Sequence, residues 1–333
     1  EQVNLLRYRI ATNYFKLRKY DKALDYLNKL ICEDKMDSEL YIMLVSCYVN
    51  LKNFNSALCI LHNFKLIQKN NKDIDKMIGE IYYYLKEYDR SIEHYKKSND
   101  KYALAPALLA NKDFKLGFEL YEDRLRTNDI CHQTKLPLRQ NIDLPNWDGK
   151  SVCKKLLVVY EQGIGDNIMY FRFLIELAKK FPSMKITYFC KDIVSHMLNG
   201  NSDNLLITHN TNDFNIPSFD YKCFIMSIPY ILEKEEIEIN EINYINVNNE
   251  KYEYWKKKIK SDRPKIGFFY KGLLISSIDK IIKIENLNKL FNLEADFICL
   301  HKKEEIKDDI NFFSKNVKTF DIDKEKAFED TIA

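Results

Sequence analysis

RKYDKAL (residues 18–24), KNFNSAL (52–58) and KEYDRSI (86–92) are three versions of one pattern, each 34 residues after the one before it. Four columns of residues keep this step, one of small side chains and three of aromatic side chains or leucine: Ala23, Ala57 and Ser91; Tyr14, Tyr48 and Tyr82; Tyr20, Phe54 and Tyr88; Leu27, Leu61 and Tyr95. A small residue lets two helices approach closely, and the aromatic residue before it fills the space beside that contact. Because each such unit buries its apolar face only by stacking on the next, the period predicts an array of helical hairpins.

A 34-residue period with small residues on one helix and aromatic residues on its partner is typical of tetratricopeptide (TPR) repeats. A fourth, shorter hairpin is predicted over residues 105–125, where Gly117 and Phe114 take the places of Ala57 and Phe54. We expect residues 1–125 to form a right-handed superhelix of three clear repeats and this short fourth one. Residues 126–150 contain prolines and no periodicity, so they are predicted to be a linker.

After residue 150, apolar runs rich in Val, Ile, Tyr and Phe alternate with helical patterns. The predicted strands are Lys155–Tyr160, Lys185–Cys190, Leu205–His209, Lys222–Ile228, Lys265–Tyr270, Ala295–His301 and Val317–Phe320. The predicted helices are Asn167–Lys180, Glu250–Lys260, Ile284–Asn292 and Glu304–Phe313. Such alternation favours parallel sheets with crossover helices. It predicts two Rossmann-like lobes that face a cleft, residues 151–262 and the start of a second lobe at 263–333.

The composition excludes several functional classes. With 46% hydrophobic and 30% charged residues the chain has the composition of a globular protein. Its net charge of +3 does not indicate a surface that binds nucleic acid. No apolar run of about 18 residues could span a membrane. The eight cysteines and six histidines are dispersed without metal-binding spacing, so we expect no metal and a reduced, cytoplasmic location.

The stretch LLVVYEQGIGDNIMYFRF (residues 156–173) holds two of the eight glycines, Gly163 and Gly165, at the end of a predicted strand. Ligands of open α/β sheets bind at that end of the strands, and glycine lets them approach the backbone closely. The N-terminus of the following helix favours a negative group of a ligand. The alternative is that Asp166 only caps the helix. A Walker loop is excluded because no G-K-[ST] follows, and a dinucleotide site is weakly supported without the third glycine.

Seven stretches occur in an order that resembles a family of TPR proteins fused to a glycosyltransferase of the GT-B type: DFKLGFELYEDRL, LPNWDGKSV, YEQGIGDNIMYFRFL, FDYKCFIMSIPYIL, PKIGFFYKG, FICLHK and FEDTIA. The lobes of this family are similar to those of bacterial heptosyltransferases and, more distantly, of protein O-GlcNAc transferases. The resemblance implies an inverting, metal-independent enzyme that needs no cofactor and uses a nucleotide-diphosphate sugar as its donor substrate. It also implies that the TPR array presents a protein or peptide acceptor.

The resemblance also implies roles for particular residues. Asp166 would be the catalytic base that takes the proton of the acceptor hydroxyl. The residues around it would bind the substrate, and hydroxyls and a lysine of the second lobe would hold the donor phosphates. The substrate-binding set is Gln162, Gly163, Gly165 and Asn167, and the donor-phosphate set is Ser276, Ser277 and Lys280.

The sequence departs from this family in the second lobe. Lys271, Gly272 and Leu273 stand where the family has other residues, and the chain ends at the segment FEDTIA, before the helix start that holds the nucleotide. We therefore expect an incomplete donor site and no sugar transfer by this chain alone. The alternative hypothesis is a non-catalytic TPR adaptor with a degenerate glycosyltransferase-like domain. A Rossmann oxidoreductase is a more distant third possibility.

Overall fold

The computed structural model describes residues 2–33, 38–126, 142–200, 202–237, 243–271, 282–313, 315, 317–322 and 331. By its internal contacts the chain divides into two units. The first contains residues 1–135 and 227–240, and the second contains residues 136–226 and 241–333. The first unit is helical, whereas the second contains two parallel sheets.

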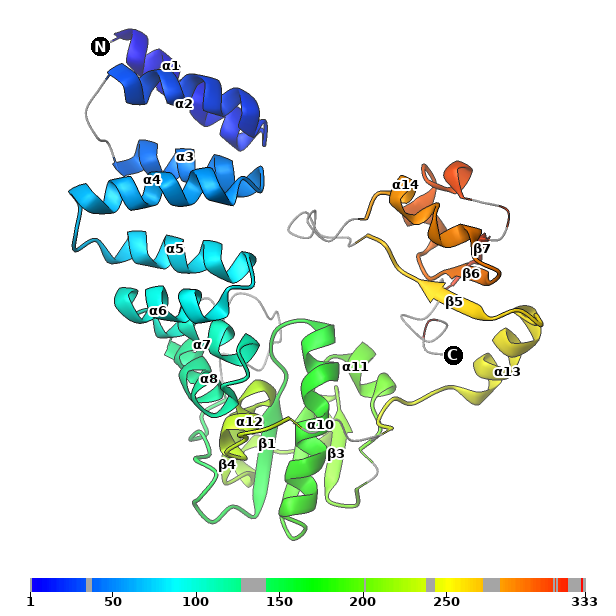
Figure 1. Cartoon of the computed structure of the whole chain (residues 1–333). Helices are drawn as coiled ribbons and strands as arrows, with labels where there is room; N and C mark the ends of the chain where they lie inside the picture. Colours follow the sequence, from blue (N-terminus) through cyan, green and yellow to red (C-terminus); the bar gives the residue numbers. More distant parts are fainter. Residues whose placement is uncertain are drawn as a thin grey trace. The chain divides into compact units, whose positions relative to one another are not determined.

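Helical hairpins build the first unit, as the repeat period predicts (Figure 1). The described residues 2–121 contain the helices α1 (Gln2–Lys16), α2 (Tyr20–Glu33), α3 (Ser38–Asn50), α4 (Phe54–Ile67), α5 (Lys72–Tyr84), α6 (Tyr88–Ser98), α7 (Lys101–Ala110) and α8 (Phe114–Tyr121). Each helix packs against the next along the chain. The fourth hairpin, α7 with α8, is present and begins at Lys101, four residues before its predicted start.

The small residues of the repeat lie at helix contacts. Ala23 and Ala57 are completely buried, and Tyr14 and Tyr48 pack beside them in the same apolar clusters. Gly117 has the same role in the fourth hairpin, because a methyl group there would come within 2.7 Å of a side-chain carbon of Leu109. The predicted register of the repeat is therefore confirmed. The hand of the superhelix stays a prediction.

The four hairpin turns share one backbone geometry. Arg18, Lys52, Lys86 and Lys112 each follow the first helix of a hairpin with a positive φ, between 56° and 67°. In each turn the next N–H donates to the carbonyl five residues earlier, at 2.9 Å, which is the bond of a Schellman motif. Glycine is the usual residue at this position, so this chain accepts a conformational cost at four equivalent sites.

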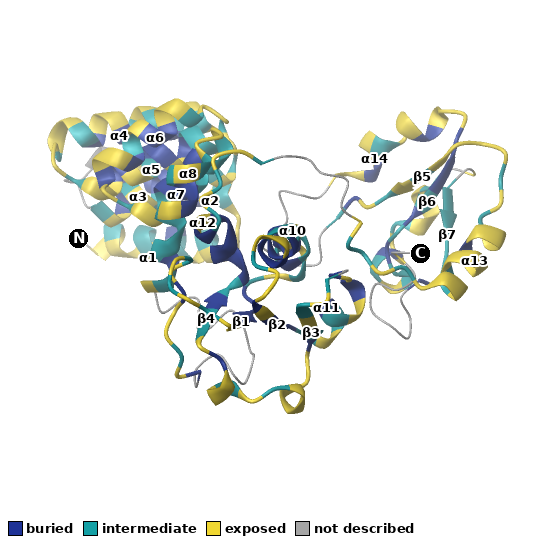
Figure 2. Ribbon diagram, turned by 90° about the horizontal axis from the view of Figure 1, so that it is seen from below, coloured by how far each residue is buried: buried dark blue, intermediate teal, exposed yellow. Residues whose placement is uncertain are grey.

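The first sheet of the second unit is parallel in the order β3-β2-β1-β4. Its strands are β1 (Lys155–Val159), β2 (Lys185–Phe189), β3 (Leu205–Thr208) and β4 (Tyr221–Phe224), and its helices are α10 (Ile164–Lys180) and α11 (Asp192–Met197). The strands β1 and β2 are buried except at their first residue (Figure 2). Because β1 lies between β2 and β4, the order of the strands reverses at β1.

The predicted strand Lys222–Ile228 is too long at its end. Strand β4 stops at Phe224, and a 3₁₀ turn (Ile225–Ser227) and the helix α12 (Ile228–Ile231) follow. Pro229 explains the change, because it has no N–H for a sheet ladder and fits the first turn of a helix. Helix α12 contacts α8 in the helical unit. Residues 227–240 belong to the helical unit, although the predicted first lobe, residues 151–262, includes them. The predicted boundaries of the two lobes stay predictions.

The second sheet is parallel in the order β5-β6-β7. Its strands are β5 (Lys265–Phe268), β6 (Asp296–Cys299) and β7 (Val317–Thr319). Phe268, Phe291 and Phe297 form its aromatic core, while Trp255 of α13 (Asn249–Lys258) packs edge-on against Phe320.

Two predicted helices of this region are shorter than expected. The first is reduced to α14 (Ile284–Leu287) and a 3₁₀ turn (Leu290–Asn292), and the second to 3₁₀ turns at Lys303–Ile306 and Ile310–Phe312. Between these last two turns the carboxylate of Asp309 accepts from the Tyr270 hydroxyl at 2.5 Å and the Lys271 ammonium at 2.6 Å. We attribute the shortening of the second helix to these tertiary contacts, which hold Asp309 against Tyr270 and Lys271. That both sheets belong to Rossmann-like lobes stays a prediction.

Candidate functional site

The loop after β1 lies where ligands of open α/β sheets bind. The strand order reverses between β1 and β4, and such a reversal leaves a crevice at the carboxyl ends of the two strands. Glu161 is the second residue after β1 and is completely buried. Its Oε1 accepts a hydrogen bond of 3.0 Å from the backbone N–H of Met226, which follows β4. This hydrogen bond therefore joins the segments that follow β1 and β4 at the point where the strand order reverses.

The backbone turns sharply between Glu161 and the helix α10. Gln162 has a φ of 61°, a left-handed conformation that costs a non-glycine residue roughly 1–2 kcal/mol. Gly163 then caps the helix, which begins at Ile164, three residues before its predicted start. Asp166 consequently lies inside the first turn. Its Oδ2 accepts from the Gly163 N–H at 3.0 Å, and its side chain is half-buried.

Asn167 holds this turn from the inside. Its amide donates to the carbonyl oxygens of Glu161 and Gly163, at 2.6 Å each. Its Oδ1 accepts from the hydroxyl of Tyr188 on β2 at 2.7 Å. Burial raises the pKa of Tyr188 well above its ordinary value, so the hydroxyl stays protonated as a donor. The amide of Asn167 thus joins the loop to the neighbouring strand and fixes its shape.

The space around Gly165 in the first turn of α10 is open, and polar groups lie nearby. A methyl group added at Gly165 would meet no atom within 4 Å. The first N–H groups of a helix have no partner within it, so they are available to a negative or polar group of a ligand. Nearby, the Tyr160 hydroxyl is buried without a hydrogen-bond partner among the described residues, and the Lys191 ammonium lies 5.0 Å from the Tyr160 ring centre. Burial also raises the pKa of Tyr160 to about 12.

The structure brings the predicted first-lobe residues together in the turn after β1 and the first turn of α10. Gly163, Gly165 and Asp166 line the outer side of these turns, whereas the Asn167 side chain is buried. Their roles in substrate binding and catalysis stay predictions. The predicted donor-phosphate residues Ser276, Ser277 and Lys280 lie outside the described residues.

Sequence reasoning did not single out Glu161 and Tyr160. The acidic residue directly after the apolar run, as in VVYE, is a signal that could have identified Glu161.

A second polar cluster lies at the carboxyl ends of β5 and β6. The His301 side chain is completely buried, and its Nε2 accepts from the backbone N–H groups of Tyr270 and Lys271, at 3.1 and 3.4 Å. Burial lowers the pKa of His301, so the neutral ring keeps its proton on Nδ1, which faces the Glu305 carboxylate at 3.3 Å. The ring stacks on Phe269 with 3.7 Å between centres. No sequence motif predicts this cluster.

These observations define a class of protein with N-terminal helical repeats that fit the TPR pattern, followed by parallel α/β sheets. No family model matches the chain, and no curated protein matches it. Among the described residues no helix is both long and apolar enough to cross a membrane.

Some solved structures resemble parts of the chain. MamA is similar at 19% identity over 37% of this chain and 81% of that one, with a TM-score of 0.32. PcrH from Pseudomonas aeruginosa is similar at 20% identity over 36% of this chain and 93% of that one, with a TM-score of 0.29. A Thermobaculum terrenum O-GlcNAc transferase variant is similar at 11% identity over 64% of this chain, with a TM-score of 0.34. The match spans 42% of that enzyme. At these scores the likenesses carry no argument about function.

Proposed function

We propose that this chain belongs to a glycosyltransferase that moves a sugar from a nucleotide-diphosphate sugar to an acceptor held by its helical repeats. The observation that carries the proposal is the loop after β1. It places a half-buried carboxylate, Asp166, beside the open first turn of α10, at the point where the strand order reverses. The seven sequence stretches that resemble TPR-linked GT-B enzymes support the same assignment.

The geometry of Asp166 suits a general base. Its Oδ2 is occupied by the Gly163 N–H, and the described residues provide no partner for Oδ1. That oxygen would accept the proton of an acceptor hydroxyl as the hydroxyl attacks the sugar. Gly165 would leave room for the sugar ring at the first helical turn. Ser276, Ser277 and Lys280 would contact the donor phosphates, with Lys280 offsetting the charge that builds on the leaving diphosphate.

The helical repeats would bind the protein or peptide partner. Large apolar side chains are exposed along the array, with exposed fractions of 64% for Leu17, 45% for Ile42 and 72% for Leu66. Contact with a partner would remove this apolar surface from water.

The experiment uses the full reading frame that contains these 333 residues and measures release of nucleoside diphosphate from nucleotide sugars. The Asp166→Asn variant keeps an oxygen to accept from Gly163, so the cap survives and only the base is lost. We expect turnover to fall by about 10²- to 10⁴-fold with little change in Tm. The Gly165→Ala variant should instead raise the KM, because its methyl group enters the open space. The matched control is Asp203→Asn, which removes an exposed carboxylate just before β3, at the amino ends of the strands.

The adaptor hypothesis has one observation in its favour, the hydrogen bond that makes Asp166 a helix cap. If the wild-type protein turns over no nucleotide sugar but still binds a partner through the repeats, the adaptor hypothesis is correct. If turnover is present and Asp166→Asn retains it fully, Asp166 is only a cap and the base lies elsewhere.

A further inference from the structure

Two of the six histidines of the sequence meet one carboxylate at the edge of the first sheet. Asp192 and His196 lie one turn apart on α11, which follows β2. His209 follows β3 directly. One ligand atom from each of the three side chains lies within 4.8 Å of the other two.

Two of the distances between these atoms match those between the ligand atoms of a metal ion. Asp192 Oδ1 lies 3.0 Å from His196 Nε2 and 3.4 Å from His209 Nδ1. Donor atoms bound to a tetrahedral Zn²⁺ ion at about 2.0–2.2 Å lie roughly 3.3 Å from one another. The two carboxylate–imidazole distances therefore already match two edges of such a tetrahedron. The two ring centres are 5.7 Å apart, and the ligand nitrogens of the two rings lie within 4.8 Å of each other.

The backbone holds the three residues in this arrangement. In the parallel pairing of β2 and β3, Phe189 lies opposite Thr208, and the Cys190 N–H donates to the Thr208 carbonyl at 2.9 Å. This bond keeps the start of α11 beside the end of β3. Ser195 Oγ lies 3.0 Å from His209 Nδ1 and donates to the Asp192 carbonyl at 2.7 Å, so it lies next to the three ligands.

We propose that Asp192, His196 and His209 bind one divalent transition-metal ion, with Zn²⁺ as the best match. Imidazole nitrogens suit Zn²⁺ rather than Mg²⁺ or Ca²⁺, and a site with two histidines and one carboxylate leaves a fourth position for water. The side chains are 69% (His196), 71% (Asp192) and 44% (His209) exposed, so an ion can enter without rearrangement of the core. The bound ion joins α11 to the end of β3 and stabilises the edge of the sheet.

The test is a calorimetric titration of metal-free protein with Zn²⁺ in a reducing buffer, together with thermal unfolding. We expect one ion per chain and a higher Tm with Zn²⁺, since an ion that binds only the folded state stabilises it. His196→Gln and His209→Gln should each weaken binding by at least about 10- to 100-fold, the cost of losing even an outer partner of a metal site. Asp192→Asn should weaken it as well.

Two controls make the result specific. His62→Gln removes an exposed histidine of α4 that has no part in the cluster, so the affinity should be unchanged. Cys59→Ser removes an exposed thiol that could compete for the ion. Because His196 and His209 are exposed, we expect their variants to fold, and circular dichroism checks this. Equal Zn²⁺ affinity in wild type and in both glutamine variants, or no binding by the wild type, overturns the proposal.

Discussion

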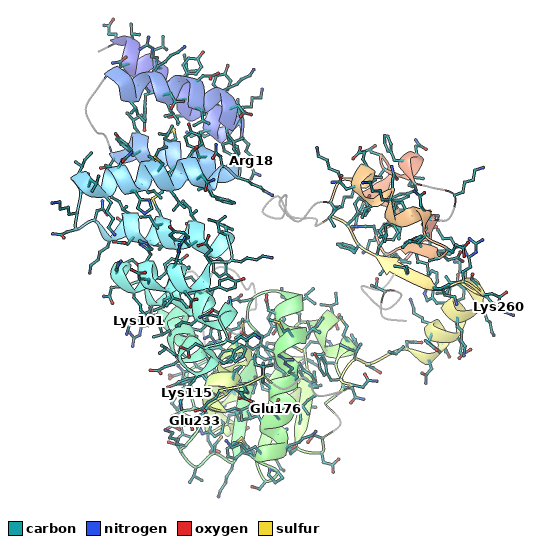
Figure 3. All side chains as sticks on the ribbon, in the orientation of Figure 1. Arg18, Lys101, Lys115, Glu176, Glu233 and Lys260 are labelled. Carbon is teal, nitrogen blue, oxygen red and sulfur yellow. The ribbon has the colours of Figure 1, made fainter. Side chains whose placement is uncertain are left out.

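The guanidinium of Arg124 is completely buried and donates a hydrogen bond of 2.8 Å to the hydroxyl of Ser227, 103 residues further along the chain. The same group pairs with Glu122, donates to the Tyr121 carbonyl at 3.1 Å and lies 4.8 Å above the Tyr121 ring. Arg124 thereby fixes the start of α12 against the last turn of the helical repeats. Lys115 and Glu233 mark the two sides of this junction in Figure 3.

Arg124→Leu should destabilise the helical unit by about 3–5 kcal/mol, because it removes the partner of the buried Ser227 hydroxyl and of the half-buried Glu122 carboxylate. Arg124→Lys should recover only part of this loss, since an ammonium cannot reproduce the planar set of donors. Ser227→Ala should cost about 1–3 kcal/mol. Urea unfolding measures all three, and a double-mutant cycle isolates the Arg124–Ser227 term. Additive single effects would contradict a direct interaction.

Ala57→Leu should destabilise the array by about 1–3 kcal/mol, because the added carbons must fit between two helices in close contact. Cys59→Leu, on the exposed face of the same helix, is the matched control and should change the free energy of unfolding by less than about 0.5 kcal/mol. Chemical denaturation compares them. Equal effects of the two substitutions would show that the repeat contact does not depend on a small residue.

Lys52→Gly should stabilise the protein by about 0.5–1 kcal/mol, because glycine adopts the left-handed conformation of this turn without steric cost. The same change at Lys29, in the interior of α2, should instead cost about 1 kcal/mol. The difference in Tm between these two variants tests the turn geometry directly. A loss of stability at Lys52 would mean that its side chain contributes more than its backbone conformation costs.

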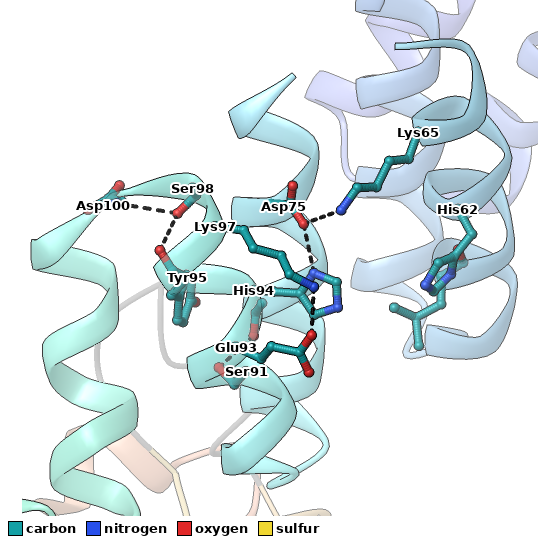
Figure 4. A network of polar contacts seen from close by, with 12 residues as sticks. His62, Lys65, Asp75, Ser91, Glu93, His94, Tyr95, Lys97, Ser98 and Asp100 are labelled. Carbon is teal, nitrogen blue, oxygen red and sulfur yellow. Dashed lines mark hydrogen bonds and ion pairs between the residues drawn. The ribbon is translucent and has the colours of Figure 1, made fainter. Parts of the chain in front are cut away.

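A polar network connects the second and third repeats (Figure 4). Asp75 of α5 is 7% exposed and accepts from Lys65 of α4 and, at 2.8 Å, from His94 Nδ1 of α6. Burial raises the pKa of Asp75, but the hydrogen bonds from Lys65 and His94 outweigh it, so the net pKa is lowered. Burial lowers the pKa of His94, an effect that Asp75 only partly opposes. We therefore assign a neutral His94 that donates its Nδ1 proton to an ionised Asp75.

Because the folded state resists protonation of His94, the unfolded state takes up the proton first as the pH falls below the ordinary histidine value of 6.5. The free energy of unfolding should therefore decrease between about pH 7.5 and pH 5. His94→Gln should reduce this pH dependence. Denaturation at several pH values checks both proteins, and an identical pH profile for the two would contradict the assignment.

Asn167→Ala should destabilise the sheet unit by at least about 2 kcal/mol, since it leaves the buried Tyr188 hydroxyl and two carbonyl groups without their partner. Tyr188→Phe should cost less, because it removes only one of these bonds. Hydrogen exchange of the N–H groups at the start of α10 should accelerate in Asn167→Ala. Unchanged exchange would mean that Asn167 does not hold the loop.

The repeat register could be predicted because it depends on local chemistry. Two helices in close contact need a small residue between them, as at Ala23 and Ala57. This requirement recurs in every repeat, so a period of 34 residues appears in the sequence itself. The strands β1 and β2 were predicted within one residue for a similar reason, because a strand buried on both faces is a continuous apolar run. The turn at Gly163 and Gly165 was visible because so few glycines occur elsewhere.

The remaining features depend on residues that are distant in the sequence. Asn167 was expected to bind substrate, and nothing in its neighbourhood indicates that its amide would meet Tyr188 on the next strand. Ser227 was placed in a strand, yet its segment joins the helical repeats through Arg124.

The sequence by itself determined the helical hairpins, the strand–turn–helix of the candidate site and the order of elements. Periodicity, glycine and buried apolar runs act over a few residues, and local chemistry is enough to show them. Only the tertiary structure decided which side chains meet. It paired Glu161 with the backbone after β4, and it brought His209 to Asp192 and His196 across two parallel strands. The physical reason is that a hydrogen bond or an ion site requires a distance near 3 Å between atoms, and only the folding of separate strands into one sheet sets that distance.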